Sequence, residues 1–334
     1  MIVEVCEDAA ALPSKLAQLQ GLAAIGPQQI GLYLTPAYLA SYVETFPEKN
    51  YLLVSLSAAG DVHAAALFVK MRGPDGDILR FAGEGLWGYS GFMAKGEQPA
   101  EIGAQLLRAA VEHGQPRWVE IGPVHESALE SHAEIARAAG LPGQVMKYAG
   151  GAPFIDTSVH QPSYIEGLKK AAYRDSLRCE KRLNELGSLG IFKLDNASLT
   201  EAAMHTAMHA FLGMYERQWP DNRFKREPRW KQFYQTFGLA AARAGMLEFS
   251  FLTIDGKPLA AHFGCLHAGR RYYFTPTYDV DYAKYSPGKV LLRKLIDTSF
   301  EQQVVFDFQN DLEAYKLDWS TAVAERYLIK LNAA

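Results

Sequence analysis

The sequence predicts an α+β protein in which a mixed, mainly antiparallel sheet flanked by helices occurs twice. The length of 334 residues suggests about two domains. The composition, with 49% hydrophobic and 21% charged residues, is typical of a globular protein and supplies enough apolar side chains for two cores. Both halves also show the same order of elements: helices, an antiparallel meander of strands, a helix and a final strand.

In the N-terminal half, apolar periodicity predicts helices at about 9–20, 35–45, 101–114 and 126–139, and strands at 51–57, 62–71, 78–82 and 117–122. The last of these helices ends in "AAGLPG", a glycine and proline stop. The turn-rich segment "YAGGAPFIDTS" (148–158) is expected to be the passage between the halves. The sequence therefore predicts two domains, at 1–152 and 153–334.

In the C-terminal half, a first helix is expected over 163–187, with Ser163 and Glu166 as a capping box. Residues 246–279 are expected to form three strands, because two tight-turn pairs, Asp255-Gly256 and Ala268-Gly269, divide them. The remaining expected elements are helices at about 199–217, 228–243 and 285–297, and strands at 190–195, 303–309 and 324–331.

Charge and cysteine content limit the class of protein. Residues 1–155 carry 10 Lys and Arg against 16 Asp and Glu, whereas residues 156–334 carry 24 against 21. The weakly basic second half suits an anionic ligand but is not basic enough for a duplex nucleic-acid binder. The three scattered cysteines fit a reducing compartment, so we expect a cytoplasmic protein. No apolar run is long enough to predict a membrane span.

The segment "YSPGKVLLRKLID" (285–297) combines a helix start with positive charge. Ser286 is expected as the N-cap and Pro287 as the first helical residue, and Gly288 lets another group approach the backbone. Lys289 stands where a capping box would have glutamate, so it adds positive charge to a helix end that already attracts anions. The alternatives are a phosphate site and an ordinary capped surface helix with a solvated basic face.

Three longer segments give the C-terminal half a family resemblance: "YRDSLRCEKRLNELGSLGIFKL", "IDGKPLAAHFGCLHAGRRYYFTPTYDVDYAKYSPGKVLLRKLID" and "FDFQNDLEAYKLDW". From about 153 to 325 the chain resembles the BioF2-like (CelD-type) acetyltransferase domain of the GNAT superfamily, a relative of the FemAB aminoacyltransferases. The N-terminal half is similar only in element order and in "GYSGF" (88–92). The resemblance implies two tandem GNAT-like domains.

The resemblance also implies a donor site. The strand at about 271–278 would present its backbone, at Phe274 and Thr275, to an acyl thioester or ester. The turn and helix start would receive the donor's phosphates, which carries over to Tyr285, Ser286, Pro287, Gly288 and Lys289. The implied donor is acetyl-CoA or another acyl-CoA. This loop has less glycine than most GNAT loops, so an aminoacyl-tRNA donor, as in the FemAB relatives, is the alternative.

For catalysis, the resemblance places Lys316 of the "YK" pair near the reacting carbonyl, where a cation stabilises developing negative charge. Acyl transfer to an amine also needs a proton acceptor. Asp307 is the first candidate. It stands between Phe306 and Phe308 in an expected strand, so its side chain should point away from the two phenyl rings. Asp279, at the end of the preceding strand, is the second candidate. A strand-edge lysine and capping carboxylates are the structural alternatives for these residues.

Aromatic and basic residues supply the candidate substrate contacts: Trp87, Tyr89, Arg174, Arg178, Arg217, Trp219 and Tyr315. Lys170, Arg174, Arg178 and Arg182 repeat every four residues, which fits either a phosphate-binding stripe or a solvated helix face. His205 and His209 lack the glutamate of a zinc-binding helix motif, so no metal is expected.

Together these features predict an N-acyltransferase that acts by direct attack. The expected acceptor is a small-molecule or glycan amine of a sugar or cell-envelope precursor. The alternatives are an aminoacyl-tRNA-dependent transferase and a non-catalytic nucleotide- or glycan-binding protein of the same fold.

Overall fold

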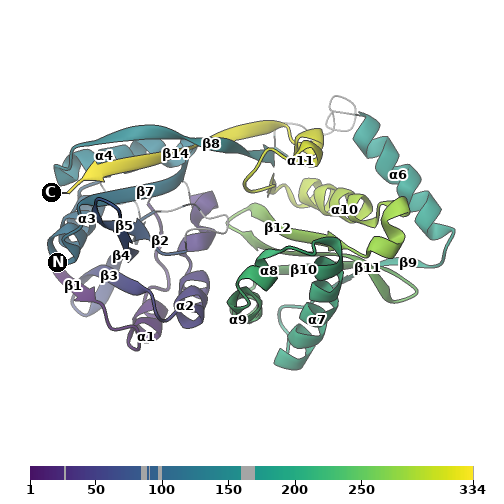
Figure 1. The fold of residues 1–334 in the computed structure, drawn as a ribbon, viewed down its shortest axis with the longest axis horizontal. Helices are drawn as coiled ribbons and strands as arrows, with labels where there is room; N and C mark the ends of the chain where they lie inside the picture. The colour runs from purple at the N-terminus through teal and green to yellow at the C-terminus, as the bar shows by residue number, and fades with distance from the viewer. Residues whose placement is uncertain (26–27, 84–88, 90, 97–99, 159–169, 334) are drawn as a thin grey trace. The chain divides into compact units, whose positions relative to one another are not determined.

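The fold is described from a computed structural model, which describes residues 1–25, 28–83, 89, 91–96, 100–158 and 170–333 (Figure 1). The residue contacts divide the chain into two compact units. The N-terminal unit comprises Met1–Gly151 and Ala324–Ala334, and the C-terminal unit comprises Ala152–Val323.

The N-terminal unit contains a mixed sheet with helices packed on it. Its described elements are β1 (Ile2–Cys6), α1 (Leu12–Ala17), β2 (Ala23–Ala24), η1 (Gln28–Leu34), α2 (Pro36–Thr45), β3 (Asn50–Ala58), β4 (Asp61–Gly73), β5 (Gly76–Phe81), β6 (Met93–Ala94), α3 (Ala100–Gly114), β7 (Trp118–His125), η2 (Glu126–Ala128) and α4 (Leu129–Ala139). The sheet order is β1-β3-β4-β5-β7, and only the β5–β7 pair in this series is parallel. Helix α3 packs on β3 and β4 and against α4.

Strand β8 (Gly143–Ile155) corrects the expectation of a turn-rich passage at 148–158. Gly150 has φ +82°, but the strand continues through it, because backbone hydrogen bonds outweigh the weak strand propensity of glycine. Phe154 and Ile155 pair antiparallel with the strand at 305–307. The last strand, β14 (Ala322–Asn332), pairs with β7, so residues 324–334 pack in the N-terminal unit and not in the C-terminal domain expected at 153–334.

The C-terminal unit is built on a sheet of order β13-β12-β11-β10-β9. Its described elements are α6 (Lys170–Asn184), β9 (Leu189–Lys193), α7 (Glu201–Gln218), α8 (Arg223–Arg226), α9 (Arg229–Arg243), β10 (Leu247–Ile254), β11 (Lys257–His267), β12 (Arg270–Tyr278), η3 (Val280–Tyr285), α10 (Pro287–Gln302), β13 (Val305–Asp307) and α11 (Ala314–Trp319). The β12–β13 pair is parallel and is connected through α10, whereas β9 to β12 are antiparallel. The predicted capping box at Ser163 and Glu166 lies outside the described residues.

Helices cover both faces of this sheet (Figure 1). On one face, Phe237 of α9 packs near Phe263 of β11. On the other face, α10 lies over the strands, and α6 packs against α10. The predicted turns at Asp255-Gly256 and Ala268-Gly269 are confirmed, since all four residues have positive φ.

A buried ion pair holds α10 to the sheet. Arg271 of β12 donates to both carboxylate oxygens of Glu248 and to the carbonyl oxygen of Leu295 in α10. Burial alone would raise the pKa of Glu248, but Arg271 and Lys193 outweigh burial and hold this pKa at about 2. The pair therefore stays ionised and fixes the register between helix and sheet.

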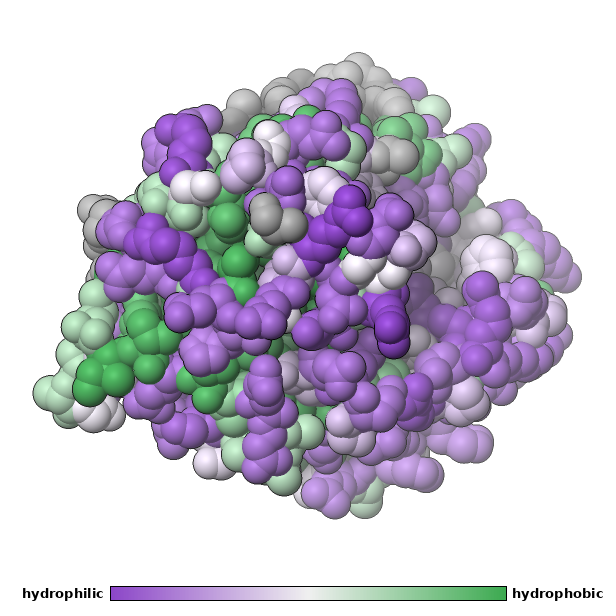
Figure 2. Space-filling view, turned by 60° about the vertical axis from the view of Figure 1, so that its left-hand side comes forward, coloured by the Kyte–Doolittle hydropathy of each residue, from purple (hydrophilic) through white to green (hydrophobic). Residues whose placement is uncertain are grey.

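The surface view in Figure 2 shows a face covered largely by hydrophilic residues, with apolar residues in small patches. In the part of the chain that the structure describes, no helix is both long and apolar enough to cross a bilayer.

Candidate active site

The site begins where β13 separates from β12. The parallel pairing covers only Arg270–Val305, Arg271–Phe306 and Tyr272–Asp307, although β12 continues to Tyr278. After β13, Gln309 and Asp311 adopt left-handed backbone conformations, with φ of 64° and 76°. These two turns direct the chain away from β12, so the pairing between the strands ends halfway along β12.

A β-bulge lies at the same point of β12. On the β11 side, Phe263 pairs with Thr275 and Cys265 pairs with Tyr272, so Tyr273 and Phe274 together face Gly264. A bulge disrupts the regular ladder and changes the direction of backbone groups. The predicted donor residues Phe274 and Thr275 turn their side chains into the core: Phe274 is 7% exposed, and the Thr275 hydroxyl is 2.7 Å from the Tyr234 hydroxyl. Only their backbone atoms are therefore suited to a donor.

Gly264, opposite the bulge, has no room for a side chain. A Cβ atom there would lie 2.4 Å from the Tyr272 carbonyl oxygen and 2.4 Å from Cε1 of His262. We expect Gly264→Ala to destabilise the C-terminal unit by about 2 kcal/mol or more, because backbone must shift. Urea unfolding measures this, with Gly213→Ala as the control, since a Cβ at Gly213 meets nothing within 4 Å. Equal stability of the two variants would contradict the expected clash.

The strand that carries the bulge leads to the N-terminus of α10. Ser286 is the N-cap, as predicted, but its φ and ψ of 51° and 54° are left-handed and its side chain makes no capping hydrogen bond. Pro287 occupies the first turn, as predicted, and this turn contains no acidic residue. The Cβ position of Gly288 is 3.4 Å from the Tyr278 ring, so glycine lets the helix start lie close to the end of β12. The arrangement leaves a helix N-terminus whose partial positive charge no acid in its first turn offsets.

The cations near this helix start differ in their availability. Lys289 forms an ion pair with Asp175 of α6 and keeps 38% of its side chain exposed. Arg293, by contrast, is buried and ion-paired with Glu180 and Asp297. Arg293 therefore stabilises the α6–α10 contact, and only Lys289 of the two can reach a ligand without breaking a buried pair.

Two further cations flank Tyr285. The Arg182 guanidinium of α6 lies 5.1 Å from the centre of the Tyr285 ring, and Lys284 Nζ lies 5.0 Å from it. Arg174 and Arg178, predicted as substrate contacts, are exposed on the same helix. The fold thus places the arginine stripe of α6 beside the predicted donor loop, which the sequence did not indicate.

Lys316 lies in α11 and is 7% exposed, so it is neither on a strand edge nor in open solvent. Its Nζ donates to the carbonyl oxygen of Asn310 and is 3.0 Å from Oε2 of Glu313. Its neighbour Tyr315 is 37% exposed, and the pKa of its phenol is raised by burial of the hydroxyl and by the charge of Glu313. Glu313, which the sequence analysis missed, connects these two predicted residues.

The two predicted carboxylate bases have structural partners. Asp307 is fully buried, accepts a 2.7 Å hydrogen bond from Arg270 and caps the Gln309 backbone N–H. Asp279 accepts from Arg217 at 3.0 Å and from the backbone N–H of Asp281. These contacts favour the capping alternative, so our proposal does not use either residue as the base.

The remaining predicted substrate residues are dispersed. Arg217 is occupied by Asp279 and Asp281, and Trp219 is 49% exposed at the end of α7. Tyr89 belongs to the N-terminal unit, where its ring packs against Tyr33 and His125 and is 3% exposed. Trp87 lies outside the described residues.

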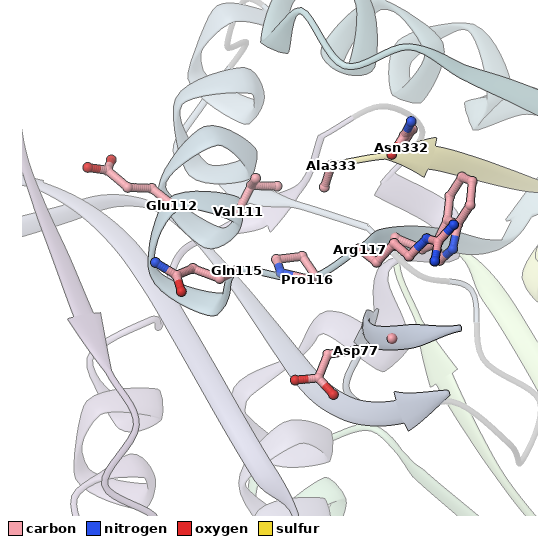
Figure 3. Close-up of a pocket in the computed structure, with 10 residues that line it drawn as sticks. Asp77, Val111, Glu112, Gln115, Pro116, Arg117, Asn332 and Ala333 are labelled. Atoms are coloured by element: carbon pink, nitrogen blue, oxygen red, sulfur yellow. The ribbon is translucent and has the colours of Figure 1, made fainter. Parts of the chain in front are cut away.

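The N-terminal unit has a separate pocket, at the end of α3 and beside β5 and β7 (Figure 3). Asp77, Gln115, Arg117 and Asn332 are among its lining residues, and none of the predicted site residues lines it. Within the described ranges, no three His, Cys, Asp or Glu side chains are grouped to bind a metal.

Part of the C-terminal unit matches a known family model. Residues 171–317 match the family model described as an acetyltransferase (GNAT) domain. No curated protein matches the sequence significantly. The structure resembles FemX, with a TM-score of 0.64, 10% identity and coverage of 98% of this chain and 97% of that chain.

Two other solved structures are similar. One is a conserved protein of unknown function from Bacteroides thetaiotaomicron VPI-5482, with a TM-score of 0.62, 10% identity and coverage of 99% and 100% of the two chains. The other is the C-terminal domain (DUF2156) of a putative lysylphosphatidylglycerol synthetase from Agrobacterium fabrum, with a TM-score of 0.57, 15% identity and coverage of 88% and 86%. The predicted α+β class, with a mixed sheet flanked by helices in each unit, is confirmed, and the family model supports the GNAT fold for the C-terminal unit.

Proposed function

We propose that this chain is an N-acyltransferase that moves an acyl group, most simply acetyl from acetyl-CoA, onto an amine of a sugar or cell-envelope precursor. One observation carries the proposal: β12 bulges at Tyr273 and Phe274 where β13 leaves it, and the same strand leads to the open N-terminus of α10. A donor could lie along this strand, with its acyl group at the bulge and its phosphates at the helix start. Within the GNAT class, we assign the C-terminal unit to the BioF2-like type.

The proposed reaction is direct attack of the amine on the acyl carbonyl through a tetrahedral intermediate. Backbone groups of the bulge polarise the carbonyl, and the Lys316 ammonium stabilises the developing oxyanion. The residues at 285–289 hold the donor's phosphates through the helix N-terminus and Lys289. We place the reaction in the cytoplasm, in line with the unpaired state of Cys6, Cys179 and Cys265.

A second candidate keeps the fold and the reaction but takes aminoacyl-tRNA as donor. The observation that favours it is the stripe of exposed arginines on α6, at positions 174, 178 and 182, beside Tyr285. This stripe is longer than one diphosphate requires. An RNA strand along this stripe would gain from several phosphate contacts.

Calorimetry with acetyl-CoA tests the donor. We expect micromolar affinity that falls when the phosphates are removed, and we expect Lys289→Glu to weaken binding about tenfold or more, because one charge-assisted contact is lost. Asp175→Asn should have the opposite effect, since Asp175 competes with the donor for Lys289. Lys231→Glu on α9, whose lysine pairs with Glu216, is the control with the same charge change.

The outcomes separate the candidates. Equal affinity of the Lys289→Glu variant and the wild type would remove the phosphate role of Lys289. If acetyl-CoA does not bind but RNA binds with a steep salt dependence, the second candidate replaces the first. If neither binds, the fold is a non-catalytic relative.

A further inference from the structure

Helix α6 sorts its charged side chains by sign. Its two acidic residues pair with cations of α10. Asp175 forms an ion pair with Lys289, and Glu180 forms ion pairs with Arg293 and Lys294. On the exposed side of the helix, the described charged residues are all basic: Arg174, Arg178, Lys181 and Arg182. We call these four residues the basic face of α6.

The basic face is continuous, and little negative charge offsets it. At 3.6 residues per turn, its four residues lie within an arc of about 100°. Arg178 has one contact, at 3.4 Å, with Asp175. In the part of the chain that the structure describes, Arg174, Lys181 and Arg182 form no ion pair. Like charges four residues apart destabilise a helix slightly, so an anionic partner would relieve this repulsion.

An exposed leucine borders the basic face. Leu177 lies three residues after Arg174 and four residues before Lys181, so it neighbours both on the helix surface, and it is 43% exposed. Leu186, in the turn after the helix, is also 43% exposed. Single exposed leucines are common on protein surfaces, but a helix face that combines cations with apolar side chains is typical of helices that lie in a bilayer interface.

Two observations favour a lipid surface over RNA as the partner of the basic face. The phosphates of either partner could pair with the arginines, but only acyl chains would bury Leu177. Single-stranded RNA usually gains further affinity from aromatic rings on which its bases stack. The ring beside the basic face, that of Tyr285, already has cations near it: the Arg182 guanidinium lies 5.1 Å and Lys284 Nζ lies 5.0 Å from its centre.

We propose that α6 attaches the protein to an anionic bilayer surface, with the basic face on lipid phosphates and Leu177 at the boundary between headgroups and acyl chains. In Figure 1, α6 lies at the outer edge of the C-terminal unit, with α10 on its inner side. The attachment is peripheral and reversible, because four cations and one leucine bind far more weakly than a membrane-spanning helix. It needs neither donor nor acceptor, so it is tested apart from the proposed function.

Co-sedimentation of the full chain with lipid vesicles tests the attachment. We expect binding to an equal mixture of phosphatidylcholine and phosphatidylglycerol, no binding to phosphatidylcholine alone, and release at high salt. Arg174→Gln combined with Arg178→Gln should lower the partition coefficient about 25-fold, at about fivefold for each cation. Lys225→Gln combined with Arg226→Gln, at exposed positions of α8, makes the same charge change and should leave binding nearly unchanged.

Leu177→Gln separates insertion from charge attraction. We expect this variant to bind the mixed vesicles about fivefold more weakly, because the leucine no longer gains from leaving water. Met71→Gln on β4 is the control, since Met71 is 44% exposed and lies outside the basic face. All these variants replace exposed side chains and should keep the wild-type circular dichroism spectrum.

A single-stranded RNA oligonucleotide, followed by fluorescence anisotropy, supplies the comparison. Any binding of RNA should be insensitive to Leu177→Gln. Binding of RNA without binding of the mixed vesicles would overturn the proposal and assign the basic face to RNA. Binding of neither would also overturn it and leave a solvated helix face. Equal binding to both kinds of vesicle would exclude attraction by anionic lipid, and equal binding of Leu177→Gln and the wild type would overturn the role of Leu177 alone.

Discussion

Replacing Lys316 by methionine is expected to lower the turnover of acetyl transfer by about 10²–10³-fold and to leave donor affinity nearly unchanged. Lys316 as a residue is 7% exposed, and in such a buried setting a charge acts more strongly on a developing oxyanion than it would in water. Methionine keeps the apolar stem that packs around α11 but removes the charge. The partner that loses its cation, Glu313, is half exposed and can be solvated, so the fold should tolerate the change.

The measurement is steady-state acetyl transfer from acetyl-CoA to hydroxylamine, with donor affinity determined separately by calorimetry. Lys231→Met on α9 removes the same charge from a surface ion pair on the other face of the sheet and should leave the rate unchanged. An unaltered rate in Lys316→Met would assign this lysine to holding Asn310 and Glu313 in place, without a part in the chemistry.

Acidification from pH 7 to pH 4 is expected to destabilise the C-terminal unit by about 3 kcal/mol through His262 alone. Burial lowers the pKa of His262 to about 3, from 6.5 in the unfolded chain. The folded protein must keep this ring neutral, whereas the unfolded chain binds a proton below pH 6.5. The stabilising contribution is therefore complete above pH 6.5 and is lost as the pH falls towards 3.

Other ionisable groups change the stability of the C-terminal unit over different pH ranges. The pKa of Glu248, held at about 2 with Arg271, lies below an unfolded value of 4.5, so its contribution is lost only below pH 4.5. Burial also lowers the pKa of His267, which adds to the loss in the same direction. Between pH 6.5 and 4.5 the loss therefore comes from the histidines and not from Glu248.

Urea unfolding of the wild type and of His262→Gln at pH 7 and pH 4 measures the effect. The variant should lose about 3 kcal/mol less on acidification, because glutamine does not titrate. His113→Gln, at an exposed position of α3, is the control and should keep the wild-type pH dependence. Equal losses in His262→Gln and the wild type would show that protons reach His262 without unfolding.

Most elements of the C-terminal unit could be predicted because their signals are local. The β10–β12 meander depends on two turn pairs that favour positive φ, and α10 depends on a proline at its first position and an apolar stripe behind it. Strand β8 was missed because glycines at 150 and 151 suggest a turn, while the strand depends on hydrogen bonds to distant segments. The short helix α11 gave no periodic signal, since six residues are too few.

The candidate site could be predicted only in part. The helix start at 285–289 and Lys316 carry recognisable local patterns, and the structure places them on α10 and α11. The bulge could not be read from sequence, because it is a difference in register between β11 and β12. His262 and Glu313 were missed for the same reason, because burial sets the properties of His262 and the contact with Lys316 sets the place of Glu313.

The sequence by itself determined the α+β class, the repeated element order and the charged helix start, since periodicity, turn residues and capping depend on neighbours within a few positions. Only the tertiary structure decided which charged groups are available. Asp307, Asp279 and Arg293 are occupied by ion pairs with residues far along the chain, whereas Lys289 and Glu313 remain accessible beside their partners. The physical reason is that burial and pairing set the chemistry of an ionisable side chain, and both depend on contacts between distant segments.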